Sequence, residues 1–101
     1  MCHLIKNNMT TFTASDLAVK IIHEQEAIIG PLAWNVARHV SGMTVKSKDY
    51  VTIPKSGSVV LASLVKKYEG LFGPASREVC RDAVQSMLPR ASAGDVPEIL
   101  K

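Results

Sequence analysis

The sequence has little of what small secreted proteins and metal-binding proteins depend on. Its only two cysteines, Cys2 and Cys80, cannot form the framework of several disulfides that holds small secreted domains together. It also lacks Cys-x-x-Cys, His-x-x-x-His and His-Glu-x-x-His spacings, which are typical of metal sites. We therefore expect reduced thiols, no metal and no cofactor, with Cys80 as a small core residue.

Long apolar runs are missing as well. No stretch approaches the ~20 apolar residues that cross a bilayer, and the N-terminus lacks the apolar segment of a signal peptide. Together with the cysteine content, these absences predict a cytoplasmic protein that has no membrane partner.

Catalytic motifs are also missing. Cys80 lies beside Val79 and three residues before Ala83 in an apolar pattern, a setting in which cysteine is usually inert. Ser76 and Ser86 have no Gly-x-Ser-x-Gly context, and no glycine-rich phosphate loop is present. We expect a protein that is not an enzyme; an enzyme with an apolar pocket between its helices is an alternative that no motif supports.

The composition is that of one globular domain. The chain has 101 residues, of which 47% are hydrophobic and 21% charged, and domains commonly have about 100–150 residues. Residues 1–12 show no periodic pattern, so we expect a flexible N-terminal tail, followed by a single domain over 13–101.

Two helices are predicted in the first half of the domain. Thr13 and Asp16 have the spacing of a capping box at the start of a helix. Gly30 suits the end of that helix, and Pro31 suits the first turn of the next, which should close at Ser41-Gly42. The apolar residues expected to face inward are Leu17, Ala18, Ile21, Ile22, Ile28 and Ile29 in the first helix, with Gln25 as an interruption, and Leu32, Ala33, Val36, Ala37 and Val40 in the second.

The second half repeats this arrangement after a strand-like insert. Residues 44–46 and 50–53 are rich in β-branched and aromatic side chains and flank a turn at 47–49, which predicts a short β hairpin. A helix should then begin near Ser56 or Ser58 and stop at Gly73-Pro74, and a fourth should run to Pro89. The inward-facing residues expected here are Leu61, Leu64, Val65, Tyr68, Leu71 and Phe72, then Ala75, Val79, Cys80, Ala83, Val84, Met87 and Leu88. The last residues should form a short helical turn over the core.

An internal repeat relates the two halves. When the sequence is shifted by 43 residues, Gly30-Pro31 falls on Gly73-Pro74, and the apolar positions before each corner coincide. The repeats span 17–43 and 60–88. Neither helix pair can bury its apolar stripe alone, so the halves should pack together. The sequence thus predicts a mainly α (α+β) fold of two αα units, each with a Gly-Pro corner, joined by a β hairpin.

The two corners carry a resemblance to a known kind of module. Gly30-Pro31-Leu32-Ala33 and Gly73-Pro74-Ala75, each after a pair of apolar residues, resemble the uncharacterised helical Gly-Pro-hydrophobic-Ala module at the ends of bacterial signalling proteins such as kinases and response regulators. The resemblance covers about residues 17–40 and 60–88. It implies a regulatory or interaction module and transfers no catalytic residue.

Two candidate surfaces follow. Trp34 lies one position off the inner stripe and could anchor a protein–protein surface, or it could belong to the edge of the core. We expect that surface to comprise Trp34, Asn35, Arg38 and His39. The main hypothesis is a non-enzymatic protein–protein interaction or regulatory module that self-associates. The alternative is a nucleic-acid-binding protein whose phosphate contacts would be Lys46, Lys48, Lys55, Lys66 and Lys67, since the net charge is +3.

Overall fold

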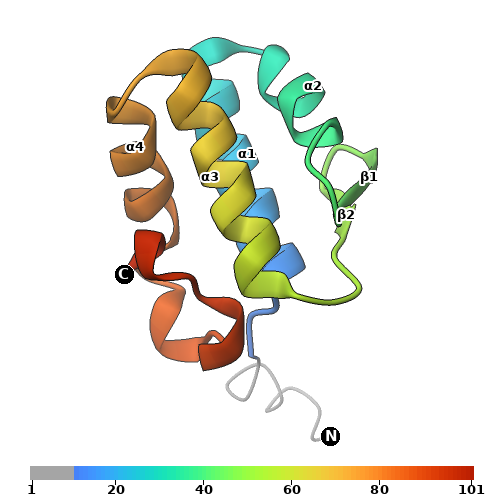
Figure 1. Ribbon diagram of the computed structural model, residues 1–101, viewed down its shortest axis with the longest axis vertical. Helices are drawn as coiled ribbons and strands as arrows, with labels where there is room; N and C mark the ends of the chain where they lie inside the picture. Colours follow the sequence, from blue (N-terminus) through green and yellow to red (C-terminus); the bar gives the residue numbers. More distant parts are fainter. Residues whose placement is uncertain (1–10) are drawn as a thin grey trace, which may run out of the picture.

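A computed structural model describes residues 11–101 and shows a mainly helical protein with one small antiparallel hairpin, as predicted (Figure 1). The predicted flexible tail falls mostly outside the described residues. The helices are α1 (Ala14–Ile29), α2 (Leu32–Arg38), α3 (Gly57–Phe72) and α4 (Ala75–Val84), and the hairpin pairs β1 (Thr44–Ser47) with β2 (Tyr50–Thr52). Short 3-10 turns follow over Leu88–Arg90, Ala93–Asp95 and Glu98–Leu100.

Helix α1 begins and ends as its sequence predicts. Thr13 Oγ1 accepts a hydrogen bond from the Asp16 N–H at 3.3 Å, and Asp16 Oδ2 accepts one from the Thr13 N–H at 2.9 Å. This reciprocal capping box satisfies two amides that a helix start leaves free. At the other end Gly30 has φ 75°, a left-handed conformation that only glycine adopts without strain.

The 43-residue offset found in the sequence also relates the helices. It maps both ends of α1 onto both ends of α3, each 16 residues long, and it maps the first residue of α2 onto the first residue of α4. The corners agree in conformation, because Gly73 has φ 98° and Pro74 has φ −58°, against 75° for Gly30 and −57° for Pro31. The two αα units therefore share the length of their first helix and the conformation of their corner, whereas α4 has 10 residues and α2 has 7.

Two buried hydrogen bonds join the two halves, and each half donates one of them. Gln25 Nε2 donates to the Ser76 carbonyl at 3.1 Å, and the Tyr68 hydroxyl donates to the Ala33 carbonyl at 2.7 Å. The offset maps Gln25 onto Tyr68 and Ala33 onto Ser76. Each bond thus joins the first helix of one unit to the second helix of the other, as an internal pseudo-two-fold axis requires.

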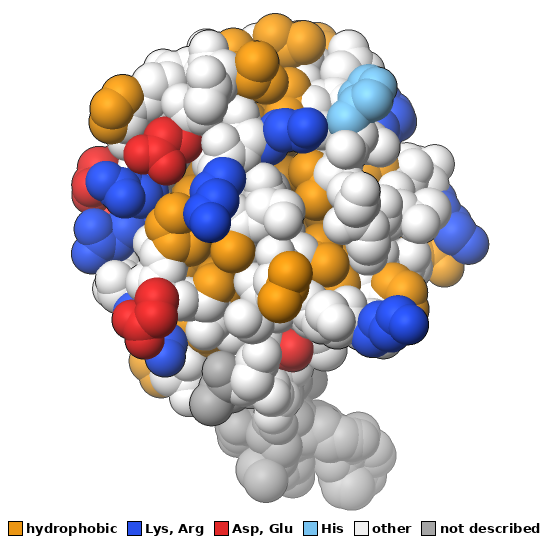
Figure 2. Space-filling model, viewed as in Figure 1, with side chains coloured by type: hydrophobic (Ala, Val, Ile, Leu, Met, Phe, Trp, Pro, Cys, Tyr) orange, Lys and Arg blue, Asp and Glu red, His pale blue; other side chains and the backbone are white. Residues whose placement is uncertain are grey.

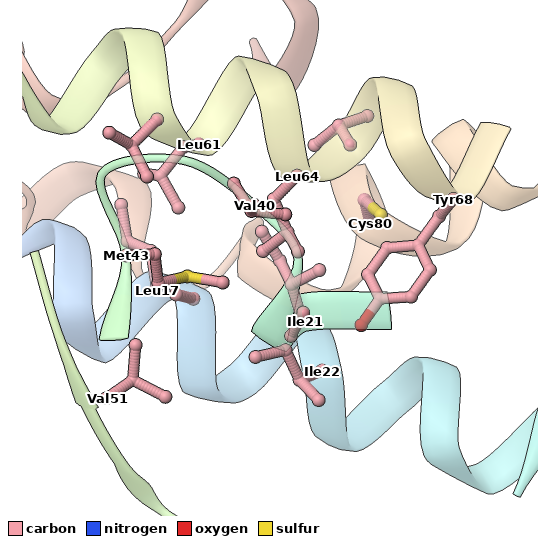
Figure 3. Close-up of a cluster of buried hydrophobic side chains, with 14 of the residues drawn as sticks. Leu17, Ile21, Ile22, Val40, Met43, Val51, Leu61, Leu64, Tyr68 and Cys80 are labelled. Carbon is pink, nitrogen blue, oxygen red and sulfur yellow. The ribbon is translucent and has the colours of Figure 1, made fainter. Parts of the chain in front are cut away.

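The core lies where the two units and the hairpin meet. Figure 3 shows Leu17 and Ile21 of α1 facing Leu61 and Leu64 of α3, and all four are fully buried. Val51 of β2 closes one side of the cluster and is 5% exposed. The hairpin therefore adds an apolar side chain to the core and is not merely a surface connection.

The predicted inward-facing stripes are wrong at their ends. Ile28 is 63% exposed, Leu71 is 61% exposed and Leu32 is 47% exposed, and Phe72 is also exposed. The buried face instead continues through Gln25, which is 1% exposed. Helical spacing does not account for the exposure of Ile28, which lies seven residues after Ile21 on the same face of α1. Ile28 is in the last turn of α1, next to the corner at Gly30.

Several expected boundaries also differ from the structure. Helix α4 ends at Val84 and not at Pro89, so that Met87 and Leu88 are only half-buried in the turns that follow. Val79 is half-buried and Ala75 is exposed, although both were expected to face inward. Helix α2 ends at Arg38, before the predicted Ser41-Gly42 stop.

The fold begins before Thr13. Phe12 is half-buried, donates its N–H to the Arg90 carbonyl at 2.8 Å and forms a parallel bridge with Ala91. This corrects the expectation that the tail reaches residue 12. The C-terminal turn is as expected, because Leu100 is fully buried against the helices.

Candidate interaction surface

Exposed apolar side chains flank both Gly-Pro corners. Ile28 and Leu32 lie on either side of the first corner, and Leu71 and Phe72 precede the second. In Figure 2 apolar side chains reach the surface at the end of the molecule where Figure 1 places these corners. Large apolar groups that cluster at a surface commonly mark a contact with another molecule.

A groove of about 380 Å³ lies between α2 and α3. Leu32, Val36 and Leu71 give it apolar walls. Its polar side chains are Asn35, His39 and Lys67. We refer to it as the α2–α3 groove.

A second groove, of about 400 Å³, lies between α1 and α4. It is lined by Ile28 and Val79, by the acidic side chains of Glu24 and Asp82, and by Lys20, among others. Lys20 Nζ lies 3.3 Å from Glu24 Oε2, an exposed pair that contributes little to stability. We refer to it as the α1–α4 groove.

The offset that relates the helices also relates the two grooves. It maps Ile28 onto Leu71 and Val36 onto Val79, which keeps the apolar character of both positions. The charge differs, because Glu24 maps onto Lys67, and Asp82 takes the position of His39. The molecule therefore has two grooves of similar volume that share apolar residues at two equivalent positions and have opposite net charge.

The structure corrects the expected role of Trp34. Its side chain is 2% exposed, so it belongs to the core and cannot anchor an exposed surface. The His23 ring covers it edge-on, with 5.6 Å between ring centroids. The indole Nε1 is buried and has no hydrogen-bond partner among the described residues.

The other three residues of the expected surface are exposed and held together at the end of α2. His39 Nδ1 lies 2.8 Å from the Asn35 carbonyl, and Arg38 Nη1 donates to Asn35 Oδ1 at 3.2 Å. Because a carbonyl only accepts, Nδ1 carries the proton, and Nε2 is left for other contacts. Asn35 and His39 line the α2–α3 groove, and their orientation is fixed from within α2.

Charged contacts hold the hairpin turn against α1. Lys48 Nζ lies 2.6 Å from Glu26 Oε2, and Asp49 contacts His23. Lys48, followed by the indole N–H of Trp34, keeps the pKa of Glu26 below its ordinary value, although the indole does not reach hydrogen-bond geometry. These contacts join the turn of the hairpin to α1, on which His23 lies against Trp34.

The five lysines of the nucleic-acid hypothesis have different surroundings. Lys48 is paired with Glu26, and Lys46 Nζ lies 5.7 Å from the centre of the Tyr50 ring. Lys55, Lys66 and Lys67 are exposed, and Lys67 lines the α2–α3 groove. On the face shown in Figure 2, Lys and Arg side chains are spread out and mixed with Asp and Glu at one edge. That pattern differs from the single basic stripe typical of nucleic-acid modules.

Two buried titratable groups lie between the halves. Burial raises the pKa of the Cys80 thiol to about 11, although the hydrogen bond from Gln25 opposes this shift. Burial also raises the pKa of the Tyr68 phenol well above its usual range. Both groups therefore stay protonated in the folded state, and neither is a nucleophile at neutral pH. Within residues 11–101 no cluster of three or more His, Cys, Asp or Glu side chains could hold a metal ion.

These two groups predict a loss of stability at alkaline pH. The unfolded thiol ionises near its ordinary pKa of 9.0, whereas the folded thiol resists ionisation until about 11. The free energy of unfolding should therefore be level below about pH 9 and fall above it, by about 1.4 kcal/mol per pH unit for each such group. Urea denaturation between pH 7 and 11 measures this.

Two variants separate the contributions. Cys80→Ala, which introduces the residue found at the equivalent position 37, should remove the part of the fall that begins near the thiol's ordinary pKa. Tyr68→Phe should remove the part that begins one pH unit higher, at the ordinary pKa of 10.0 for tyrosine. A wild-type profile that stays flat to pH 11 contradicts the burial of both groups.

Comparison of the chain with protein-family models, with curated proteins and with solved structures finds no match. No helix in the described part of the chain has the length and hydropathy needed to cross a membrane.

Sequence reasoning missed the residues that give the grooves their character. Leu71, Ile28 and Leu32 were assigned to the core, and Glu24 and Asp82 were treated as ordinary outward-facing charges. Helical spacing gave no signal that separates Ile28 and Leu71 from the core, because they lie seven residues after Ile21 and Leu64, on the same helix faces.

Proposed function

We propose that this chain is a non-enzymatic protein–protein interaction or regulatory module that self-associates, in the cytoplasm and in a bacterial signalling setting. The main support is the α2–α3 groove, with its exposed Leu32 and Leu71. Each Å² of this apolar surface that a second protein buries would contribute about 25 cal/mol of favourable free energy. The setting rests on the resemblance of the two Gly-Pro corners to the helical module of signalling proteins.

Nucleic-acid binding has less support as the alternative. Its phosphate contacts would need Lys46 and Lys48, of which one lies against an aromatic ring and the other is paired with a carboxylate. The groove residues offer apolar contacts, which phosphate binding does not use.

Sedimentation equilibrium of the full chain over a concentration series tests the proposal. We expect the mean mass to rise with concentration. The double variant Leu32→Ser/Leu71→Ser should weaken the affinity of self-association by at least about 10-fold, because it removes two exposed apolar contacts. Val59→Ser is the matched control, since Val59 is 66% exposed and lines neither groove.

Two outcomes count against the proposal. A strict monomer at every concentration contradicts self-association. Binding to duplex DNA that falls steeply with added salt favours the alternative function.

A further inference from the structure

We propose that copies of this chain associate head to tail, with the α2–α3 groove of one copy docked on the α1–α4 groove of the next. The inference rests on the proposed self-association and specifies its geometry. It follows from the similar volumes of the two grooves, their matching apolar positions and their opposite net charge.

The matching apolar positions of the grooves make the two kinds of docking comparable in their apolar contacts. The pseudo-two-fold axis maps Leu71 onto Ile28 and Val36 onto Val79. These two pairs of positions therefore offer similar apolar contacts in both kinds of docking, whereas Leu32 has no counterpart that lines the α1–α4 groove. Apolar contact alone does not require head-to-tail docking.

Charge makes the choice. A symmetric contact through the α2–α3 groove brings Lys67 of one copy toward Lys67 of the second copy, and like charges repel. In the mixed contact, Lys67 faces a groove lined by two carboxylates, Glu24 and Asp82, and one amine, Lys20. Since Glu24 is already paired with Lys20, Asp82 is the carboxylate that Lys67 of the neighbouring copy can meet.

The groove charges are also available for such a contact. Within residues 11–101, neither Lys67 nor Asp82 takes part in an ion pair. Glu24 is paired only with Lys20, and both side chains are nearly half exposed. A second copy can therefore engage Lys67 and Asp82 without breaking an ion pair within the fold.

The placement of the grooves allows one copy to bind two neighbours. Figure 1 shows α2 and α4 on opposite sides of the α1–α3 pair. One groove lies beside each of these outer helices. A contact between two different surfaces does not close on itself in a dimer, so it extends to chains or closes into rings.

The test uses one substitution in the middle of each groove. Leu71→Asn places an amide in the α2–α3 groove, and Ile28→Asn does the same in the α1–α4 groove. Both positions are more than 60% exposed in the monomer, so folding should be preserved, which circular dichroism checks. Asparagine is uncharged, so the two altered grooves gain no attraction for each other. Val59→Asn is the control at an equally exposed site.

In sedimentation equilibrium the wild type should form species larger than dimers. Each groove variant alone should lose at least about 10-fold in affinity, because the docked contact would bury an unpaired amide. An equimolar mixture of the two variants should form a 1:1 dimer that grows no further, since one intact groove of each kind remains. Val59→Asn should behave as the wild type.

Other outcomes would contradict the docking mode, the self-association or the role of the groove charges. If the wild type stops at a dimer that only one groove variant disrupts, or if the mixture stays monomeric while the wild type associates, head-to-tail docking is wrong and self-association stands. If the wild type is monomeric at all concentrations, both fail. Association that does not weaken with added salt contradicts the role assigned to the groove charges.

Discussion

Leu64→Ala is expected to lower the free energy of unfolding by about 3 kcal/mol, whereas Leu71→Ala should lower it by less than about 0.5 kcal/mol. Both leucines lie on α3, two helical turns apart, and both belong to the apolar pattern of the sequence. Leu64 is fully buried and Leu71 is 61% exposed. The first substitution leaves a cavity in the core, and the second removes only surface contacts. Urea denaturation at low protein concentration, where association does not contribute, measures both.

The other half of the molecule supplies the matched control. Ile21 and Ile28 occupy the equivalent positions on α1 and are fully buried and 63% exposed, respectively. Ile21→Ala and Ile28→Ala should therefore reproduce the large and the small effect. If Leu71→Ala costs as much as Leu64→Ala in the dilute monomer, Leu71 is covered by the chain itself, and the α2–α3 groove is not an open surface.

These pairs also show how far the sequence predicts the fold. The helix starts, the two corners and the hairpin are encoded locally, by Thr13 and Asp16, by the Gly-Pro pairs and by a short run of strand-type residues. Each of these features could be read without knowing what the neighbouring helices are, and the structure confirms them. The face that each helix buries is less local, because it depends on where the other helices cross it.

Gln25 illustrates the limit. As an amide in an apolar pattern it was interpreted as an interruption, yet it is buried and donates to the Ser76 carbonyl. A buried amide is tolerated only where it finds a partner, and this partner lies 51 residues away. Ile28 lies on the same face, seven residues after Ile21, yet it is exposed in the last turn of α1. Trp34 likewise lies in the core and not on the expected surface, with the His23 ring edge-on against it. The grooves result from these long-range placements, so the sequence pattern alone did not reveal them.

Gly57→Ala is expected to destabilise the protein by about 1–3 kcal/mol. A Cβ at residue 57 would lie 2.7 Å from Ala14 Cβ and 2.6 Å from Asp95 Oδ1. The Asp95 carboxylate can rotate away, but Ala14 Cβ is fixed to the backbone of α1. Gly70→Ala is the matched control on the same helix, because a Cβ there meets nothing within 4 Å. It should leave the stability unchanged or raise it by up to about 1 kcal/mol. Thermal or urea denaturation of both variants measures the difference.

A double-mutant cycle between Ala14 and Gly57 tests whether the two units meet at equivalent residues. The offset maps Ala14 onto Gly57, and the two residues are in contact, so the pseudo-two-fold axis passes between them. Ala14→Gly alone should cost about 1 kcal/mol, from the lost methyl group and the freer backbone. The double variant Ala14→Gly/Gly57→Ala exchanges the two residues between the units. Removal of the Ala14 methyl group leaves room for the methyl group added at residue 57. The free energy of unfolding of the double variant should therefore exceed the value expected from adding the single effects by at least about 1 kcal/mol. Strict additivity would mean that the two backbones do not approach each other at this point. In that case α1 and α3 would pack less closely than described, and the two grooves on either side of them would be placed differently.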